Sequence, residues 1–274
     1  MLTLSSPAKI NLFLQVVNRR PDQYHNLASL FQTISLSDQI EMVLANKDKL
    51  ECSDPSLPTD STNLVWKAVD LFRRKTARLC RVRIRLQKNI PSQAGLGGGS
   101  SNAATVIWGL NALCGSNIPE AILARWSGEI GSDVPFFFSQ GTAYCTGRGE
   151  IVQPVDFVNN DSVWIVKPTE GSSTPEVFSK VQLDLLPQRD PLDALQACIA
   201  GKMEYFNDLE QSAFSALPKL AQLKEELLGN GFHKVVMTGS GSSFVCYGAP
   251  LRPLPPSLFS LKVSFIQRVA GKWY

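Results

Sequence analysis

The sequence of 274 residues has little of what marks several classes of protein. It contains two histidines, and its six cysteines are scattered at positions 52, 80, 114, 145, 198 and 246 with no C-x-x-C pair. A zinc site built from cysteine and histidine is therefore not predicted. We expect the cysteines to be reduced thiols in the core, as is typical of a cytoplasmic protein.

Long apolar runs and a large excess of one charge are also missing. No apolar run approaches the ~18 residues of a membrane span and no charged-then-apolar leader opens the chain, so we expect neither membrane insertion nor export. The formal charge of +3 is too small to indicate a nucleic-acid partner. The basic stretch at 73–86 alternates Arg81, Arg83 and Arg85 with apolar residues, as on a strand with one solvated face.

The chain is rich enough in apolar residues, at 44%, to bury a large core, and its length fits about two domains of ~150 residues. Apolar alternation predicts strands at 7–17, 31–44, 82–86, 163–168 and 261–269. Helical spacing predicts helices within 60–74, 103–114, 119–129, 191–200 and 212–228, the first capped by Asp60, Ser61 or Thr62. Because strands and helices do not alternate strictly, we predict an α+β protein in two halves, residues 1–154 and 155–274.

The stretch IPSQAGLGGGSSNAATVIWGL, residues 90–110, places a glycine-rich loop between a predicted strand and a predicted helix. Glycines let backbone N–H groups approach a ligand without an obstructing Cβ, and a helix N-terminus adds unpaired donors and a partial positive charge. We therefore predict that this loop binds phosphate. The alternative is a flexible surface loop, but such loops rarely separate a strand from a strongly patterned helix.

Three common phosphate-binding signatures do not describe this loop. A P-loop needs a lysine after its last glycine, whereas Ser100 follows Gly99. The dinucleotide pattern G-x-G-x-x-G fails because Gly95 and Gly97 are followed by Ser100 at the third position. The protein-kinase landmarks H-R-D and D-F-G are absent from the sequence.

The stretch PSQAGLGGGSSNAA resembles the phosphate loop of the GHMP small-molecule kinases, which include galactokinase, homoserine kinase and mevalonate kinase. Two further motifs of this family occur in order, SSPAKINLFLQV near the start and MTGSGSS at 237–243. The resemblance implies the two-domain GHMP kinase fold, with an N-terminal mixed sheet covered by helices and a smaller C-terminal α/β sandwich. It also implies ATP as phosphoryl donor and Mg²⁺ as the accompanying metal.

Five shorter stretches resemble one branch of the family, namely PAKINLFL, YH, NL, GSDVPFF and STPEVF. That branch phosphorylates the 2-hydroxyl of a methylerythritol unit bearing a cytidine diphosphate, in the non-mevalonate isoprenoid pathway. The implied partner is therefore a small molecule, and the sequence indicates no nucleic-acid, membrane or protein partner. One departure is Thr238, where members of the family commonly have serine.

The resemblance also implies roles for individual residues. Asp133 falls at the position of the catalytic base and Lys9 at that of its cationic partner; by spacing alone, Asp133 is a turn residue and Lys9 a solvated charge. ATP binding is implied for Asn63, Lys88, Pro91, Ser92, Gln93, Ala94, Gly95, Leu96, Gly97, Gly98, Gly99, Ser100 and Ser101. Substrate binding is implied for Asn11, Tyr24, His25, Thr174 and Phe178.

Several of these residues also have ordinary structural interpretations. Ser100 and Ser101 are as well suited to cap the following helix as to bind phosphate or metal. Without the resemblance, Lys88 is a surface charge, Tyr24 and Phe178 are core rings, and His25 is a turn residue.

Two other functions stay open at this point. The first is another GHMP activity, such as homoserine or mevalonate kinase, against which the YH turn and STPEVF argue. The second is a nucleotide- or sugar-sensing regulator without turnover. Retention of both Lys9 and Asp133 argues against a regulator.

Overall fold

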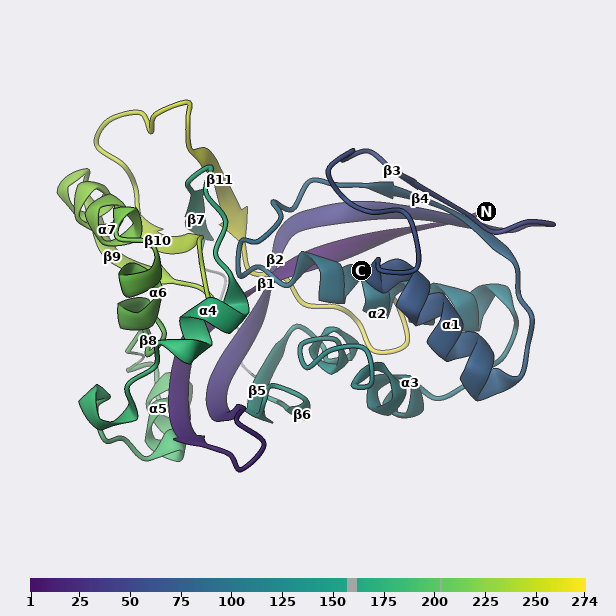
Figure 1. The fold of residues 1–274 in the computed structure, drawn as a ribbon, viewed down its shortest axis with the longest axis horizontal. Helices are drawn as coiled ribbons and strands as arrows, with labels where there is room; N and C mark the ends of the chain where they lie inside the picture. The colour runs from purple at the N-terminus through teal and green to yellow at the C-terminus, as the bar shows by residue number, and fades with distance from the viewer. Residues whose placement is uncertain (157–161, 203) are drawn as a thin grey trace.

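The computed structural model describes residues 1–156, 162–202 and 204–274, and Figure 1 shows their arrangement. A mixed sheet has the order β3-β4-β2-β1-β8, with β5 paired to β2 and β6 to β5; β3–β4 and β1–β8 are parallel. Its strands are β1 (Leu2–Arg19), β2 (His25–Leu44), β3 (Lys49–Cys52), β4 (Val82–Gln87), β5 (Thr142–Gly147), β6 (Ile151–Pro154) and β8 (Phe206–Asn207). A smaller antiparallel sheet has the order β11-β7-β10-β9. Its strands are β7 (Ser162–Lys167), β9 (Phe232–Met237), β10 (Phe244–Gly248) and β11 (Phe259–Ser264).

Helices cover one face of each sheet (Figure 1). The larger sheet carries α1 (Leu64–Thr76), α2 (Gly98–Leu113) and α3 (Glu120–Ser127), followed by the short 3₁₀ helix η1 (Pro135–Phe138). The second half of the chain contains α4 (Thr174–Ser179), η2 (Leu183–Leu185), α5 (Pro191–Ile199), α6 (Glu210–Ala216) and α7 (Lys219–Gly229). None of the helices in the described part of the chain has the length and apolar character of a membrane span.

Strand β1 joins the two halves of the molecule. Its apolar side chains belong to three successive core clusters, with Leu4 in the first, Ile10 in the second and Leu14 in the third. The β1–β2 register shifts between Pro7 and Ala8 and again between Asn11 and Phe13. Because β-bulges bend a strand and re-aim its side chains, both strands curve across the molecule in Figure 1.

Several predicted elements are confirmed, and two boundaries are corrected. Strand β4 buries alternate residues, as the arginine alternation predicted. Helix α1 is capped by Asn63, whose side chain accepts a hydrogen bond from the backbone N–H of Val65, so the predicted caps at 60–62 are wrong. The helical pattern at 212–228 forms two helices, α6 and α7, because the residue before Pro218 is disfavoured in helical conformation.

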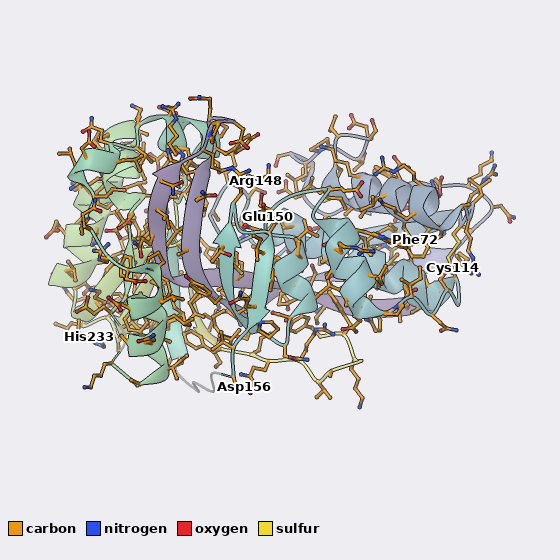
Figure 2. All side chains as sticks on the ribbon, turned by 90° about the horizontal axis from the view of Figure 1, so that it is seen from below. Phe72, Cys114, Arg148, Glu150, Asp156 and His233 are labelled. Carbon is orange, nitrogen blue, oxygen red and sulfur yellow. A yellow bond between two sulfur atoms is a disulfide. The ribbon has the colours of Figure 1, made fainter. Side chains whose placement is uncertain are left out.

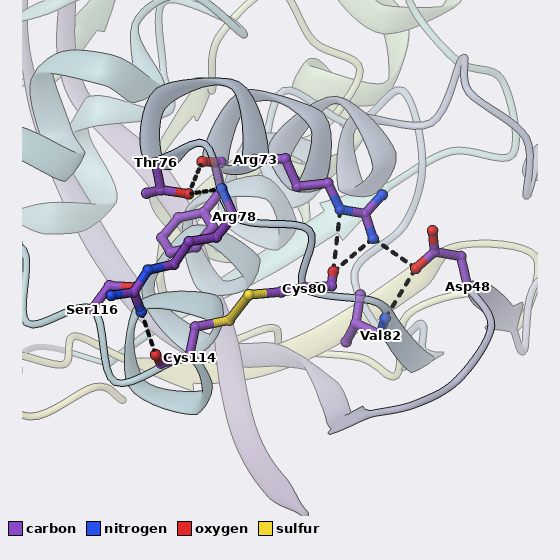
Figure 3. Close-up of a disulfide and its surroundings, with 9 residues drawn as sticks. Asp48, Arg73, Thr76, Arg78, Cys80, Val82, Cys114 and Ser116 are labelled. Carbon is purple, nitrogen blue, oxygen red and sulfur yellow. Dashed lines mark hydrogen bonds and ion pairs between the residues drawn. A yellow bond between two sulfur atoms is a disulfide. The ribbon is translucent and has the colours of Figure 1, made fainter.

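The expectation of six reduced cysteines is wrong for one pair. Figure 3 shows a disulfide between Cys80, after α1, and Cys114, at the end of α2, with 6.8 Å between their Cα atoms. The two are separated by 34 residues, so their pairing depends on the packing of α1 against α2, which sequence spacing does not reveal. Cys145, Cys198 and Cys246 are free and buried, and burial raises the pKa of the Cys198 thiol to about 12.

The end of the chain returns to the larger sheet. The indole N–H of Trp273 donates to the carbonyl of Ser5 at 3.0 Å, and Arg268 forms an ion pair with Glu120 at 2.7 Å. Figure 1 accordingly shows the C-terminus beside α2. The predicted division into residues 1–154 and 155–274 stays a prediction.

Candidate active site

A cavity of about 1000 Å³ is lined by residues from both halves of the chain. It brings together every site residue predicted above except Ser101. Ser101 is fully buried, and its hydroxyl oxygen accepts a hydrogen bond from the hydroxyl of Ser6 at 2.8 Å. The structure thus collects in one place residues that lie far apart in the sequence, and it turns Ser101 away from that place.

The glycine loop presents a helix N-terminus to this cavity. Helix α2 begins at Gly98, and its first turn closes when the N–H of Ser101 donates to the carbonyl of Gly97 at 2.9 Å. The N–H groups of Gly98, Gly99 and Ser100 come before this first intrahelical donor. All three residues line the cavity. N–H groups at such a helix N-terminus are suited to bind an anion. Both serines lie inside α2, so the alternative that one of them caps the helix is wrong.

Two glycines of the loop have no room for a side chain. Gly97 has a φ of 68°, and a Cβ there would lie 2.9 Å from Cγ of Lys9. Gly95 has a φ of 72°, and a Cβ there would lie 2.1 Å from the carbonyl oxygen of Thr238. The N–H of Ser243 also donates to the carbonyl of Ala94. The first and last glycine motifs of the sequence therefore pack backbone against backbone.

Lys9 and Asp133 form an ion pair on the cavity wall. Their charged atoms are 3.4 Å apart, and the side chains are 4% and 32% exposed respectively. The Lys9 ammonium also donates to Oδ1 of Asn11 at 3.0 Å and lies 4.5 Å from the ring centroid of Phe31. Asp133 stands in the turn before η1, so its carboxylate can meet a ligand while Lys9 is held in place by its buried neighbours.

Asn11 connects this pair to the C-terminal glycine motif. Besides Lys9, its Oδ1 accepts hydrogen bonds from the hydroxyl of Thr238 at 3.1 Å and from the N–H of Gly239 at 2.9 Å. Its Nδ2 donates to the hydroxyl of Ser29 at 2.8 Å. Because Oδ1 already has three donors and one N–H of Nδ2 bonds Ser29, Asn11 has the other N–H of Nδ2 to offer to a ligand. The hydroxyl of Thr238 therefore links the C-terminal glycine motif to Asn11, at the position where members of the family commonly have serine.

The Lys88 side chain is only 8% exposed, so it is not a solvated surface charge. It forms an ion pair with Asp38, which is itself fully buried and accepts hydrogen bonds from the N–H groups of Asn89 at 2.7 Å and Ile90 at 2.9 Å. The side-chain amide of Asn102 donates to the same carboxylate at 2.9 Å. A buried carboxylate with this many donors fixes the start of the glycine loop and the position of the lysine.

Sequence reasoning missed Asp38, although a signal was present. In the strand at 31–44, Asp38 has the same parity as Leu36, Ile40 and Met42, which are all buried. A carboxylate on the apolar face of a strand needs partners, because an unpaired buried charge is costly. That pattern could have predicted a buried ion pair, but not its lysine.

Aromatic rings lie at the other end of the cavity. The rings of His25 and Phe178 stack with their centroids 5.5 Å apart, whereas Tyr24 is 58% exposed. Burial, and then the nearby charge of Arg19, lower the pKa of His25 below its usual 6.5. The imidazole is therefore uncharged at neutral pH and has both a donor and an acceptor.

Thr174 and Asn63 complete the set of predicted residues. The hydroxyl of Thr174, at the start of α4, bonds the hydroxyl of Ser240 at 2.7 Å. Asn63 uses its amide oxygen to cap α1 and its amide nitrogen to bond the carbonyl of Pro58 at 2.7 Å. Asn63 therefore shapes the mouth of the cavity beside the glycine loop through the backbone that it holds.

Comparison with known proteins decides between the alternatives. Residues 63–141 match the family described as GHMP kinases N terminal domain. The 4-diphosphocytidyl-2-C-methyl-D-erythritol kinase of Protochlamydia amoebophila is 50% identical over 273 residues, which cover 100% of this chain and 93% of that protein. The chain belongs to the 4-diphosphocytidyl-2-C-methyl-D-erythritol kinase family. It is a small-molecule kinase, and the predicted GHMP resemblance is confirmed.

Two more relatives extend this result. The chloroplastic/chromoplastic 4-diphosphocytidyl-2-C-methyl-D-erythritol kinase of Solanum lycopersicum is 44% identical over 293 residues, covering 100% of this chain and 73% of that protein. A crystal structure of 4-(cytidine 5'-diphospho)-2C-methyl-D-erythritol kinase superposes with a TM-score of 0.79 at 30% identity, covering 96% of this chain and 99% of that one. The predicted α+β fold is thereby confirmed.

Proposed function

We propose that this kinase transfers the γ-phosphoryl group of ATP to the 2-hydroxyl of 4-diphosphocytidyl-2-C-methyl-D-erythritol, in the non-mevalonate isoprenoid pathway. The observation that carries the proposal is the position of the Lys9–Asp133 pair in a cavity with an anion-binding helix end on one side and aromatic rings on the other. A substrate with a base at one end and a reacting hydroxyl at the other fits such a cavity.

Asp133 acts as the general base in this mechanism. Its carboxylate accepts the proton of the 2-hydroxyl as the oxygen attacks the γ-phosphorus and the bond to the β-phosphate oxygen breaks. Lys9, held by Asn11 and Phe31, offsets the negative charge that moves from the hydroxyl oxygen to the phosphoryl group. Neither residue has to reorganise, because the ion pair is already formed.

ATP binds through the glycine loop, with Lys88 and Asn63 at its edges. The donor set also suits magnesium, which takes oxygen ligands, keeps several waters and usually needs one or two protein oxygens besides the phosphates. The Ser100 hydroxyl is an oxygen donor on the cavity wall that would hold it. When bound, the metal offsets charge on the transferred phosphoryl group.

The cytidyl end of the substrate binds at Tyr24, His25 and Phe178, with Asn11 and Thr174 on the path toward Asp133. An aromatic ring contributes about 1–3 kcal/mol per base stacked on it. Neutral His25 can both donate to and accept from a cytosine edge, which presents an amino group, a ring nitrogen and a carbonyl.

We further propose a cytoplasmic location, in keeping with a small-molecule substrate and with four cysteines present as free thiols. The Cys80–Cys114 disulfide instead favours an oxidising compartment, because such bonds are rare in reducing ones. Cell fractionation with an antibody to the chain decides between the two. Recovery with secreted or envelope fractions would contradict the proposal.

ADP release with magnesium and ATP tests the proposed activity against a panel of four acceptors: the cytidyl substrate, homoserine, mevalonate and galactose. We expect turnover with the cytidyl substrate and background rates with the other three. Turnover on mevalonate alone would overturn the substrate, and no turnover with any acceptor, from a protein that binds ATP, would favour a regulator.

A further inference from the structure

The turn between β5 and β6 places an arginine on the cavity wall. Arg148 stands between two glycines with positive φ, 70° at Gly147 and 116° at Gly149. The Glu150 carboxylate accepts a hydrogen bond from the backbone N–H of Arg148 at 2.6 Å. The turn is therefore fixed by its own residues. Figure 2 shows Arg148 and Glu150 side by side where these two strands meet.

This turn lies between the two ends of the proposed substrate site. On one side, the guanidinium carbon of Arg148 is 5.2 Å from the ring centroid of Tyr24. On the other, a Cβ at Gly149 would lie 3.3 Å from Oδ1 of Asp133. Any molecule that reaches from the aromatic rings to the catalytic carboxylate passes this turn.

Arg148 differs from the two lysines of the cavity in the weakness of its anionic contacts, which are with the partly exposed Glu150 and the exposed Asp22. Lys9 is paired with Asp133 at 3.4 Å, and Lys88 with buried Asp38. The nearest ion pair of Arg148 joins its Nε to Glu150 at 3.7 Å, with side chains 37% and 28% exposed. Pairs of this exposure contribute little. In the described part of the chain, its two Nη groups make no hydrogen bond.

We propose that Arg148 binds the diphosphate of the cytidyl substrate. This assignment rests on the proposed function, in which the diphosphate separates the cytosine from the reacting methylerythritol. A planar guanidinium can donate two parallel hydrogen bonds to phosphate oxygens, and its delocalised charge stacks on an aromatic ring at the same time. Arg148 therefore contributes to the choice of substrate: it favours a nucleoside diphosphate derivative over a compound that carries the base alone.

The contact is made before and during phosphoryl transfer alike. An interaction of equal strength in the ground state and the transition state changes KM and leaves kcat unaltered. Loss of Arg148 should therefore weaken substrate binding with little effect on the chemical step, in contrast to loss of Asp133.

Binding and kinetics of Arg148→Met and Arg148→Lys test this inference, with Arg83→Met as control because Arg83 is an exposed arginine of β4. For Arg148→Met we expect about a 10-fold higher KM for the cytidyl substrate and an unchanged kcat, with Arg148→Lys in between. Calorimetric titration should show CDP binding about 10-fold weaker to Arg148→Met than to wild type, and cytidine binding unchanged. Arg83→Met should match wild type throughout.

Each contrary outcome has a separate meaning. Equal losses for CDP and cytidine would overturn the inference and assign Arg148 to holding Tyr24. A lower kcat at unchanged KM would overturn it in favour of a role at the transferred phosphoryl group. The calorimetry does not depend on turnover, so a wild-type protein that fails to phosphorylate the cytidyl substrate refutes the proposed function, while CDP binding still decides the role of Arg148.

Discussion

The two ends of the cavity are built in different ways. At the proposed ATP end, backbone atoms and buried polar groups form the wall: Gly95 touches Thr238 through main-chain atoms, and Asp38 is fully buried among its donors. At the proposed cytidyl end, side chains from separate segments form the wall, and Tyr24 is 58% exposed. The ATP end thus depends on conformation and tolerates few residue types, whereas the cytidyl end depends on the side chains placed there.

The largest effect is expected where the two ends meet. Asp133→Asn should lower kcat by about 10²- to 10⁴-fold, the usual range for loss of a general base, while the KM for ATP stays near its wild-type value. Steady-state kinetics and ATP titration measure the two quantities. Near-normal turnover would remove Asp133 from the mechanism.

A change at the ATP end should act through the backbone. Gly95→Ala puts a methyl group 2.1 Å from the Thr238 carbonyl oxygen, so we expect a loss of stability beyond the roughly 1–2 kcal/mol that a left-handed alanine costs, and a KM for ATP at least ~10-fold higher.

The matched control for Gly95 is Gly115→Ala. Gly115 also has positive φ, at 56°, but nothing lies within 4 Å of the added Cβ. It should show the conformational cost alone and bind ATP normally. If chemical unfolding and ATP titration gave the same result for both variants, the contact between the two glycine motifs would contribute neither to stability nor to ATP binding.

Substitutions at the proposed cytidyl end should leave the KM for ATP unchanged. Tyr24→Ala and Phe178→Ala should each lower kcat/KM for the cytidyl substrate by at least ~10-fold, because each loses about 1–3 kcal/mol of stacking. The KM for ATP, measured in the same assays, serves as the internal control. A parallel rise in both KM values would show that these rings stabilise the fold and do not bind the cytosine base.

The smallest effect concerns pH. The pKa of His25 is lowered, so the imidazole is uncharged above pH 6.5 and gains a proton only as the pH falls through its lower folded value. The stability that neutral His25 contributes is thus present above 6.5 and lost below it.

We expect the KM for the cytidyl substrate to rise several-fold as the pH falls through that folded value, since protonated imidazole has no acceptor. The KM for ATP should stay flat. His25→Gln, which cannot titrate, should remove the dependence, and an unchanged pH profile in that variant would exclude His25 as its source.

The same contrast explains what the sequence could predict. The glycine loop at 95–100 could be predicted to bind an anion because a backbone that approaches an anion must be glycine-rich, whereas the turn at 239–241 was recognised only as a motif of the family. The roles of Asp133 and the aromatic residues were predicted by resemblance alone, since an isolated aspartate or tyrosine has too many ordinary roles. The position of Arg148 beside Tyr24 and the pairing of Cys80 with Cys114 could not be predicted from the sequence. Both depend on how β5, α1 and α2 pack in the folded chain.

The relative efficiency on a truncated substrate tests most directly whether both ends of the cavity act together. The ADP-release assay would compare kcat/KM for 4-diphosphocytidyl-2-C-methyl-D-erythritol with that for methylerythritol phosphate, which keeps the reacting hydroxyl and lacks the cytidine. We predict at least about a 10³-fold preference for the full substrate, because an unfilled polar site leaves its donors and acceptors unpaired. Equal efficiencies would show that the aromatic end does not bind the base, and would contradict the proposed division of the cavity.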